Sequence, residues 1–63
     1  MKVTPGLTYT HIRTGHRYTV VDRCQTKVGK DWVDGVVYER YLTAGQLYVR
    51  PYREFVEKFE RAA

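Results

Sequence analysis

The sequence predicts one mainly β domain over residues 1–63, a small antiparallel barrel or roll with a short C-terminal α-helix packed on it. Short segments rich in β-branched and aromatic residues alternate with glycine-containing turns, as in small β domains. Near the C-terminus the hydrophobic period changes from that of a strand to that of a helix. The chain of 63 residues is long enough for one small core and too short for a two-domain enzyme or a large closed substrate cleft.

The first part of the chain is predicted to form a hairpin. Residues 7–12 contain mostly β-branched and aromatic side chains and form its first strand. Gly15 lies in the following turn, where glycine accepts the positive φ that a tight hairpin requires. Residues 17–25 form the second strand, in which strict alternation places Asp22 and Cys24 on the apolar face. Because a carboxylate does not suit that face, we expect a β-bulge or bend near Asp22.

Two further strands are predicted in the middle of the chain. Residues 26–34 are mostly polar, contain Gly29 and are followed by Gly35, so we expect a connection there. Residues 36–42 form the third strand. A turn at residues 43–46 then leads to a short fourth strand at residues 47–49, which completes an antiparallel meander.

The C-terminal segment is predicted to be a helix over about residues 52–61. Apolar side chains recur there at i, i+3, i+4 and i+7, at Tyr52, Phe55, Val56 and Phe59. The preceding Pro51 suits the first turn of a helix, where a missing N–H group costs nothing. We expect the apolar stripe of this helix to pack on the end of the curled sheet.

Three ordered segments resemble a known family. They read YTHIRTGHRYTV at residues 9–20, VVY at residues 36–38, and GQLYVRP followed by EFVEK within residues 45–58. Across about residues 6–60 the chain resembles the small bacterial and phage family filed as domain of unknown function 1653. The resemblance implies an SH3-like β-roll capped by the C-terminal segment, and it implies no activity. The chain departs from that family at residues 26–34, which are rich in lysine here and contain the single tryptophan.

Positive charge is concentrated in the first half of the chain. Residues 1–30 contain six Lys or Arg and one Asp, whereas residues 31–63 contain five basic and six acidic residues. A basic half is typical of a nucleic-acid partner, and also of a solvated surface that keeps a small protein in solution. No two basic residues are adjacent, which favours the solvated surface.

The sequence contains few groups suited to catalysis, metal binding or membrane insertion. His11 and His16 have no Cys or carboxylate at zinc-ligand spacing, and we expect His11 to be half-buried with a satisfied hydrogen bond. Cys24 is expected to be a small core residue rather than a reactive thiol. No apolar run approaches the roughly 20 residues of a membrane-spanning helix. We therefore expect the protein not to be an enzyme and to use no cofactor, metal or membrane contact. We expect a cytoplasmic location, which is the host cytoplasm if a phage encodes the chain.

Tyrosine and tryptophan rings are the strongest functional feature. The six Tyr and one Trp are more than such a small core can bury. Alternation places Tyr38 and Tyr41 on opposite faces of their strand, so at least one of the two is exposed. An exposed ring beside an arginine suits either an extended peptide or an unpaired base.

We therefore expect a small non-enzymatic binding module with a protein partner. The alternative is an SH3-like module that binds RNA or DNA through the basic N-terminal half. For Arg50 we favour a structural role, a bridge from the sheet to the helix through Glu54 or Glu39, and the alternative is a clamp for a phosphate or carboxylate. Basic residues gathered on one face beside an exposed ring would favour nucleic acid, and scattered ones would favour a protein. The candidate binding surface comprises Arg13, Arg17, Arg23, Lys27, Lys30, Trp32, Tyr41 and Arg50.

Overall fold

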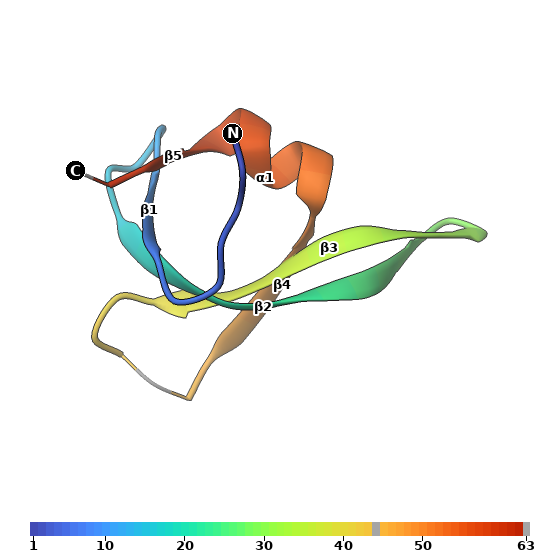
Figure 1. Ribbon diagram of the computed structural model, residues 1–63, viewed down its shortest axis with the longest axis horizontal. Helices are drawn as coiled ribbons and strands as arrows, with labels where there is room; N and C mark the ends of the chain where they lie inside the picture. The colour runs from blue at the N-terminus through green and yellow to red at the C-terminus, as the bar shows by residue number, and fades with distance from the viewer. Residues whose placement is uncertain (44, 63) are drawn as a thin grey trace.

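A curved sheet of five antiparallel strands packs on one short helix in the computed structural model, which describes residues 1–43 and 45–62 (Figure 1). The strand order is β4-β3-β2-β1-β5, so the C-terminal strand returns to pair with β1. The mainly β fold with a short helix is confirmed, and the sheet is an open roll because its edge strands β4 and β5 do not pair within the described residues. The elements are β1 (Thr8–His11), β2 (Arg17–Val28), β3 (Asp31–Arg40), β4 (Leu47–Pro51), α1 (Tyr52–Lys58) and β5 (Phe59–Arg61).

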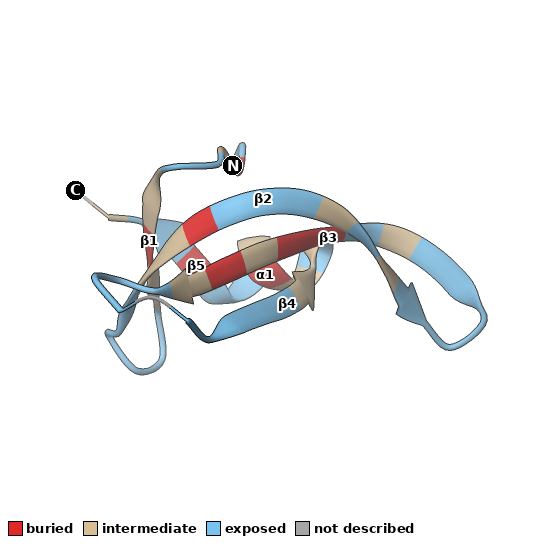
Figure 2. Cartoon of the chain, turned by 90° about the horizontal axis from the view of Figure 1, so that it is seen from below, coloured by how far each residue is buried: buried red, intermediate tan, exposed pale blue. Residues whose placement is uncertain are grey.

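The β2–β3 hairpin extends well beyond the rest of the molecule (Figure 1). A connection was expected at residues 26–34, and this prediction is wrong, because β2 continues to Val28 and β3 begins at Asp31. Only Gly29 and Lys30 lie between the strands, and the φ of 60° at Gly29 suits such a two-residue turn. Polar residues are compatible with strands here because most of this arm, residues 24–34, is exposed to solvent (Figure 2).

The predicted irregularity near Asp22 is confirmed. The register of β2 against β3 shifts between Val20 and Asp22, which leaves Val21 as an extra residue. The bulge reverses the alternation beyond it, so Cys24 lies opposite Gly35 on the outer face, away from α1. The expectation that Cys24 belongs to the core is therefore wrong, and its side chain is only partly buried. Arg23 lies on the inner face instead, towards the helix.

The helix ends earlier than predicted. It ends at Lys58, and residues 59–61 form β5, in which Phe59 pairs with His11 of β1. Pairing with the edge of β1 satisfies backbone groups that a last helical turn would leave to water, so tertiary pairing outweighs the local helical period. Phe59 keeps its predicted burial, but as a strand residue. Within the described residues, no helix is long and apolar enough to cross a membrane.

The core lies between the inner face of the sheet and α1 (Figure 2). Phe55 of α1 stacks on Phe59 with a centroid separation of 4.1 Å, and it meets Tyr9 edge-on at 5.5 Å. The third predicted strand ends at Arg40 rather than at residue 42, and the predicted turn at residues 43–46 includes residue 44, which is outside the described residues. The buried hydrophobic residues are Val3, Tyr9, Val20, Val36, Tyr38, Phe55 and Phe59.

Candidate functional site

A hollow lined mainly by aromatic rings opens on the inner face of the sheet, and all five strands contribute side chains to it. Its volume is about 190 Å³. The antiparallel register produces this convergence, since Tyr38 lies opposite Tyr48, and His11 lies opposite Phe59. The residues of this aromatic hollow are His11 from β1, Thr14 from the β1–β2 turn, Tyr18 from β2, Tyr38 from β3, Tyr48 and Arg50 from β4, and Phe59 from β5.

The rings of the hollow form one packed cluster. Tyr38 stacks on Tyr48 with centroids 5.5 Å apart, and Tyr18 meets Tyr38 edge-on at 5.4 Å. Tyr38 and Phe59 are buried, whereas Tyr48 is 40% exposed. The hollow thus has a rigid aromatic base and an accessible ring at its rim, as in preformed ligand sites.

Arg50 is fixed at the edge of the hollow by two short hydrogen bonds. Its Nε donates to the Tyr38 hydroxyl at 2.7 Å, and its Nη1 donates to Glu54 Oε1 of α1 at 2.7 Å. The favoured structural role of Arg50 is confirmed, with Glu54 rather than Glu39 as the partner. These bonds use two of the five N–H donors of a guanidinium group, so three donors remain on a side chain that is already ordered.

The two ends of the Tyr38–Arg50 hydrogen bond affect each other's pKa. Burial raises the pKa of the Tyr38 hydroxyl, and the bond from Arg50 opposes that change without cancelling it. Burial lowers the pKa of Arg50, but the interactions with Tyr38 and Glu54 outweigh burial and raise it above its ordinary value. Both groups therefore keep their protons at neutral pH, the hydroxyl as an acceptor for Arg50 and the guanidinium as a full cation.

His11 forms the opposite side of the hollow. The expectation of a half-buried histidine with a satisfied hydrogen bond is confirmed, since its Nδ1 lies 2.9 Å from Thr14 Oγ1. Burial lowers the pKa of His11, and positive charge on Arg50, Lys58, His16 and Arg13 lowers it further. Of these basic residues, Arg50 lines the same hollow as His11, and Arg13 and Lys58 line a neighbouring one.

The predicted surface residues of the arm form a separate group. Lys27 lies opposite Trp32, with its Nζ 5.8 Å from the ring centroid, and Lys30 is in the turn at the tip. The Trp32 side chain is 64% exposed. Residues 22–34 contain three basic and three acidic residues, so this segment has no net charge.

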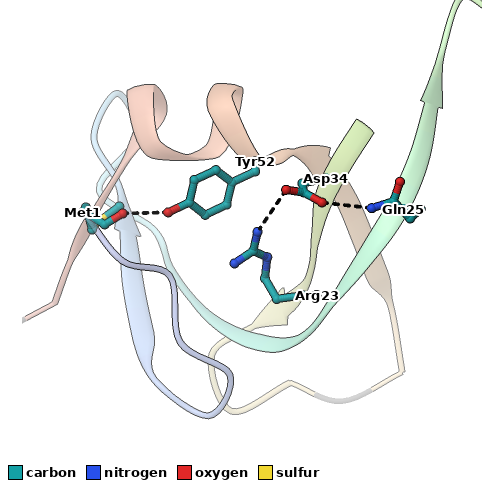
Figure 3. Close-up of polar contacts among 5 residues, drawn as sticks. All are labelled: Met1, Arg23, Gln25, Asp34 and Tyr52. Atoms are coloured by element: carbon teal, nitrogen blue, oxygen red, sulfur yellow. Dashed lines mark hydrogen bonds and ion pairs between the residues drawn. The ribbon is translucent and has the colours of Figure 1, made fainter. Parts of the chain in front are cut away.

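Arg23 is engaged in contacts within the protein. Its guanidinium lies 4.2 Å from the centroid of the Tyr52 ring, and its Nη2 lies 4.0 Å from Asp34 Oδ2. Gln25 donates to the other oxygen of Asp34 at 2.9 Å, and Tyr52 donates to the Met1 carbonyl at 2.8 Å (Figure 3). These contacts connect the base of the arm, the helix and the N-terminal segment.

Arg13, Arg17 and Tyr41 lie away from the arm. Arg13 is in the β1–β2 turn, and Arg17 begins β2 with its guanidinium 5.4 Å from the centroid of the Tyr41 ring. Tyr41 is 40% exposed while Tyr38 is buried, so the prediction that one of the two is exposed is confirmed. The eight predicted residues are thus scattered over three places: the arm with Arg23 at its base, the opposite end of the sheet, and the hollow, to which Arg50 alone of the eight belongs.

Most residues of the hollow were not predicted as a site. A hairpin closed by a turn at residues 43–46 would place Tyr48 opposite Tyr41. The actual β3–β4 connection is longer, and Tyr48 lies opposite Tyr38 instead. The abundance of tyrosine was the available signal, but only the register shows which of these rings meet.

Comparison of the chain with protein-family profiles, curated proteins and solved structures found no match. The resemblance to the domain of unknown function 1653 family therefore stays a prediction. Within residues 1–43 and 45–62, no group of three or more His, Cys, Asp or Glu side chains is placed to hold a metal ion.

Proposed function

We propose that the protein is a non-enzymatic interaction module that binds an extended segment of a protein partner in the aromatic hollow. The observation that supports this most is the convergence of side chains from all five strands on one open hollow. Apolar and aromatic walls with a few fixed polar groups are typical of sites that bind peptides or small ligands. The resemblance supports a bacterial or phage origin, with a host protein as the partner of a phage-encoded chain. The single cysteine, which cannot form an internal disulfide, supports a reducing cytoplasm as the location.

The position of the hollow beside an edge strand also supports a peptide ligand. Within the described residues β4 pairs only with β3, so its other edge is available for a further strand. Tyr48 and Arg50 are two apart on β4 and both face the hollow. A segment that runs along β4 would place alternate side chains over this pair.

The scattered basic residues favour a protein over nucleic acid. The arm contains the most exposed ring of the predicted surface, but its flanking charges balance to zero over residues 22–34. A nucleic-acid surface needs a continuous excess of positive charge to neutralise phosphates.

Selection from a library of random displayed peptides tests the proposal. The wild-type protein serves as bait, and Tyr48→Ala and Trp32→Ala serve as matched variants that each remove one exposed ring. We expect the selected peptides to lose at least about tenfold in affinity on Tyr48→Ala, because an aromatic anchor dominates such interfaces, and to lose little on Trp32→Ala. Peptides that depend on Trp32 and not on Tyr48 would contradict the proposal.

Single-stranded nucleic acid is the second candidate. The pairing of Lys27 with the exposed Trp32 favours it, because a ring beside a cation provides a stacking surface for an unpaired base. The two candidates differ in where the ligand lies, since a nucleic acid would use the arm and a peptide the hollow.

A further inference from the structure

Arg50 provides the positive charge in the lining of the aromatic hollow, and further basic side chains lie near His11. The charged groups that act on His11 come from three elements: Arg50 from β4, Lys58 from α1, and Arg13 and His16 from the β1–β2 turn. Glu57 of α1 lines a neighbouring hollow of about 230 Å³ together with Lys58 and Arg13, and Glu54 neutralises part of the charge on Arg50. Arg50, Lys58 and Arg13 outnumber these two carboxylates, so the surroundings of His11 and Arg50 are complementary to a negatively charged group.

Arg50 provides a preformed donor for such a group. Tyr38 and Glu54 hold the guanidinium, and its carbon atom lies 5.6 Å from the centroid of the Phe59 ring. A ligand would therefore not have to order this long side chain, which removes much of the usual entropic cost of binding. The remaining N–H groups suit a carboxylate, because a planar guanidinium matches its geometry.

His11 provides a second polar contact. The Nδ1 atom of His11 is hydrogen-bonded to Thr14 Oγ1. The same oxygen accepts a hydrogen bond from the His16 backbone N–H at 3.3 Å. The ring position is therefore fixed, and Nε2 is the nitrogen that a ligand can engage. The ring also packs on Phe59 at a centroid distance of 4.9 Å, so it belongs to the same cluster as the base of the hollow.

We propose that the segment bound in the hollow carries an acidic side chain, Asp or Glu, whose carboxylate binds between the remaining N–H groups of Arg50 and the imidazole of His11, with a neighbouring apolar or aromatic side chain on Tyr48. This inference rests on the proposed function, because it names the chemistry of the segment that the module binds. An acidic side chain fits better than a chain end, since a segment along the β4 edge continues past the hollow in both directions.

Blocked dipeptides test this chemistry by NMR titration of the isotope-labelled full chain. The first probe is acetyl-phenylalanyl-glutamate amide, and its matched neutral control is acetyl-phenylalanyl-glutamine amide. We expect the glutamate probe to bind on the order of tenfold more tightly, because a charge-assisted hydrogen bond to arginine is lost in the control. The largest shifts should fall on residues of the hollow. Equal affinities for the two probes would overturn the inference.

Two further probes distinguish an acidic side chain from other groups that carry negative charge, a C-terminal carboxylate and a phosphate. Tighter binding of acetyl-glutaminyl-phenylalanine, which has a free C-terminal carboxylate, would overturn the choice of an acidic side chain. Tighter binding of a thymidine tetranucleotide to the same residues would overturn a protein ligand at this site. The library selection described above does not depend on the charge of the peptide. If that selection succeeds and the glutamate probe fails, the binding module stands and only the acidic side chain is refuted.

The pH dependence of binding provides an independent readout. A bound carboxylate favours the charged imidazole, so we expect the glutamate probe to bind about threefold more tightly at about pH 5.5 than at about pH 7.5. His11→Gln should abolish this difference, and the matched variant His16→Gln should retain it. A pH dependence that follows His16 instead would contradict the proposed position of the carboxylate. His11→Gln is more informative than Arg50→Gln, which also removes the bridge to α1.

Discussion

Arg50 connects the sheet, the helix and the aromatic hollow through single contacts that can be removed one at a time. Tyr38→Phe deletes the hydroxyl that accepts from Arg50 Nε and keeps the buried ring. We expect this change to lower the free energy of unfolding by about 1–3 kcal/mol, because a partly buried charged donor loses its acceptor. Chemical denaturation measures it, with Tyr41→Phe as the exposed control. A Tyr38→Phe variant as stable as this control would show that the hydrogen bond contributes nothing.

Position 35 requires glycine because there is no space for a side chain, and not because its backbone conformation is unusual. A Cβ atom at this position would lie 2.9 Å from Cys24 Sγ and 3.0 Å from Thr26 Cγ2 on the neighbouring strand. We expect Gly35→Ala to lower the free energy of unfolding by about 1–3 kcal/mol through overpacking. The double variant Cys24→Ala, Gly35→Ala should recover part of the loss, since it removes the sulfur atom. Strictly additive losses in a double-mutant cycle would refute this explanation.

The residue-level predictions succeeded where local chemistry determines the contact. Arg50 precedes the helix and lies four residues before Glu54, so Glu54 was one of the two partners that the sequence indicated, and the structure shows the ion pair with it. Cys24 was misplaced because the single-residue bulge at Val21 reverses every later side chain of β2. The sequence indicates that a bulge is needed near Asp22, but not the residue at which the register shifts.

At the scale of elements, α1 is held to the sheet mainly by Phe55. The ring is fully buried and meets Tyr9, Tyr38 and Phe59 at centroid distances of 5.5, 5.4 and 4.1 Å. Phe55→Ala should cost about 3–5 kcal/mol, which is comparable to the whole stability of a domain of this size. We expect circular dichroism to show an unfolded or nearly unfolded chain at room temperature.

Arg53→Ala is the control for the helix, because Arg53 is exposed in the same element. This variant should keep a thermal midpoint close to that of the wild type. A Phe55→Ala variant with an unchanged midpoint would show that α1 does not depend on its core contact.

The elements were predicted best where hydrophobic periodicity reflects burial. Strand positions around Val20 and Val36 alternate because one face is covered, and the helical stripe begins at Tyr52 for the same reason. The arm has both faces in solvent over most of its length, so its residues show no such alternation and resemble a connection. The end of α1 was missed because Phe59 fits the helical period, yet pairing with β1 determines its conformation.

At the scale of the whole molecule, the arrangement of charge separates the two candidate ligands. Trp32 fluorescence can be titrated with single-stranded and duplex oligonucleotides at two salt concentrations. We expect no affinity tighter than about 10 µM at physiological salt, as in non-specific binding, because the arm has no net charge. Sub-micromolar quenching with a slope of log affinity against log salt of about −2 to −4 would indicate three to five phosphate contacts and favour nucleic acid.

The topology explains why the candidate site was largely missed. The aromatic hollow needs β5 beside β1 and β4 beside β3, so that residues as distant as His11 and Phe59 become neighbours. Local sequence patterns predict strands, but not the strand order or the register that brings their rings together. The resemblance predicted the roll and named no site residues.

Binding of a protein segment in the aromatic hollow can be tested by the backbone amide chemical shifts of the full chain, measured by NMR with a library-selected peptide. We expect the largest shifts on His11, Tyr18, Tyr48 and Arg50, and we expect Tyr48→Ala to reduce all of them together. The arm, with Lys27 and Trp32, should change little, because it lies outside the hollow. If the largest shifts fell on the arm or on the outer face of the sheet, with the hollow unchanged, the peptide would not bind in the hollow and the proposed function would be wrong.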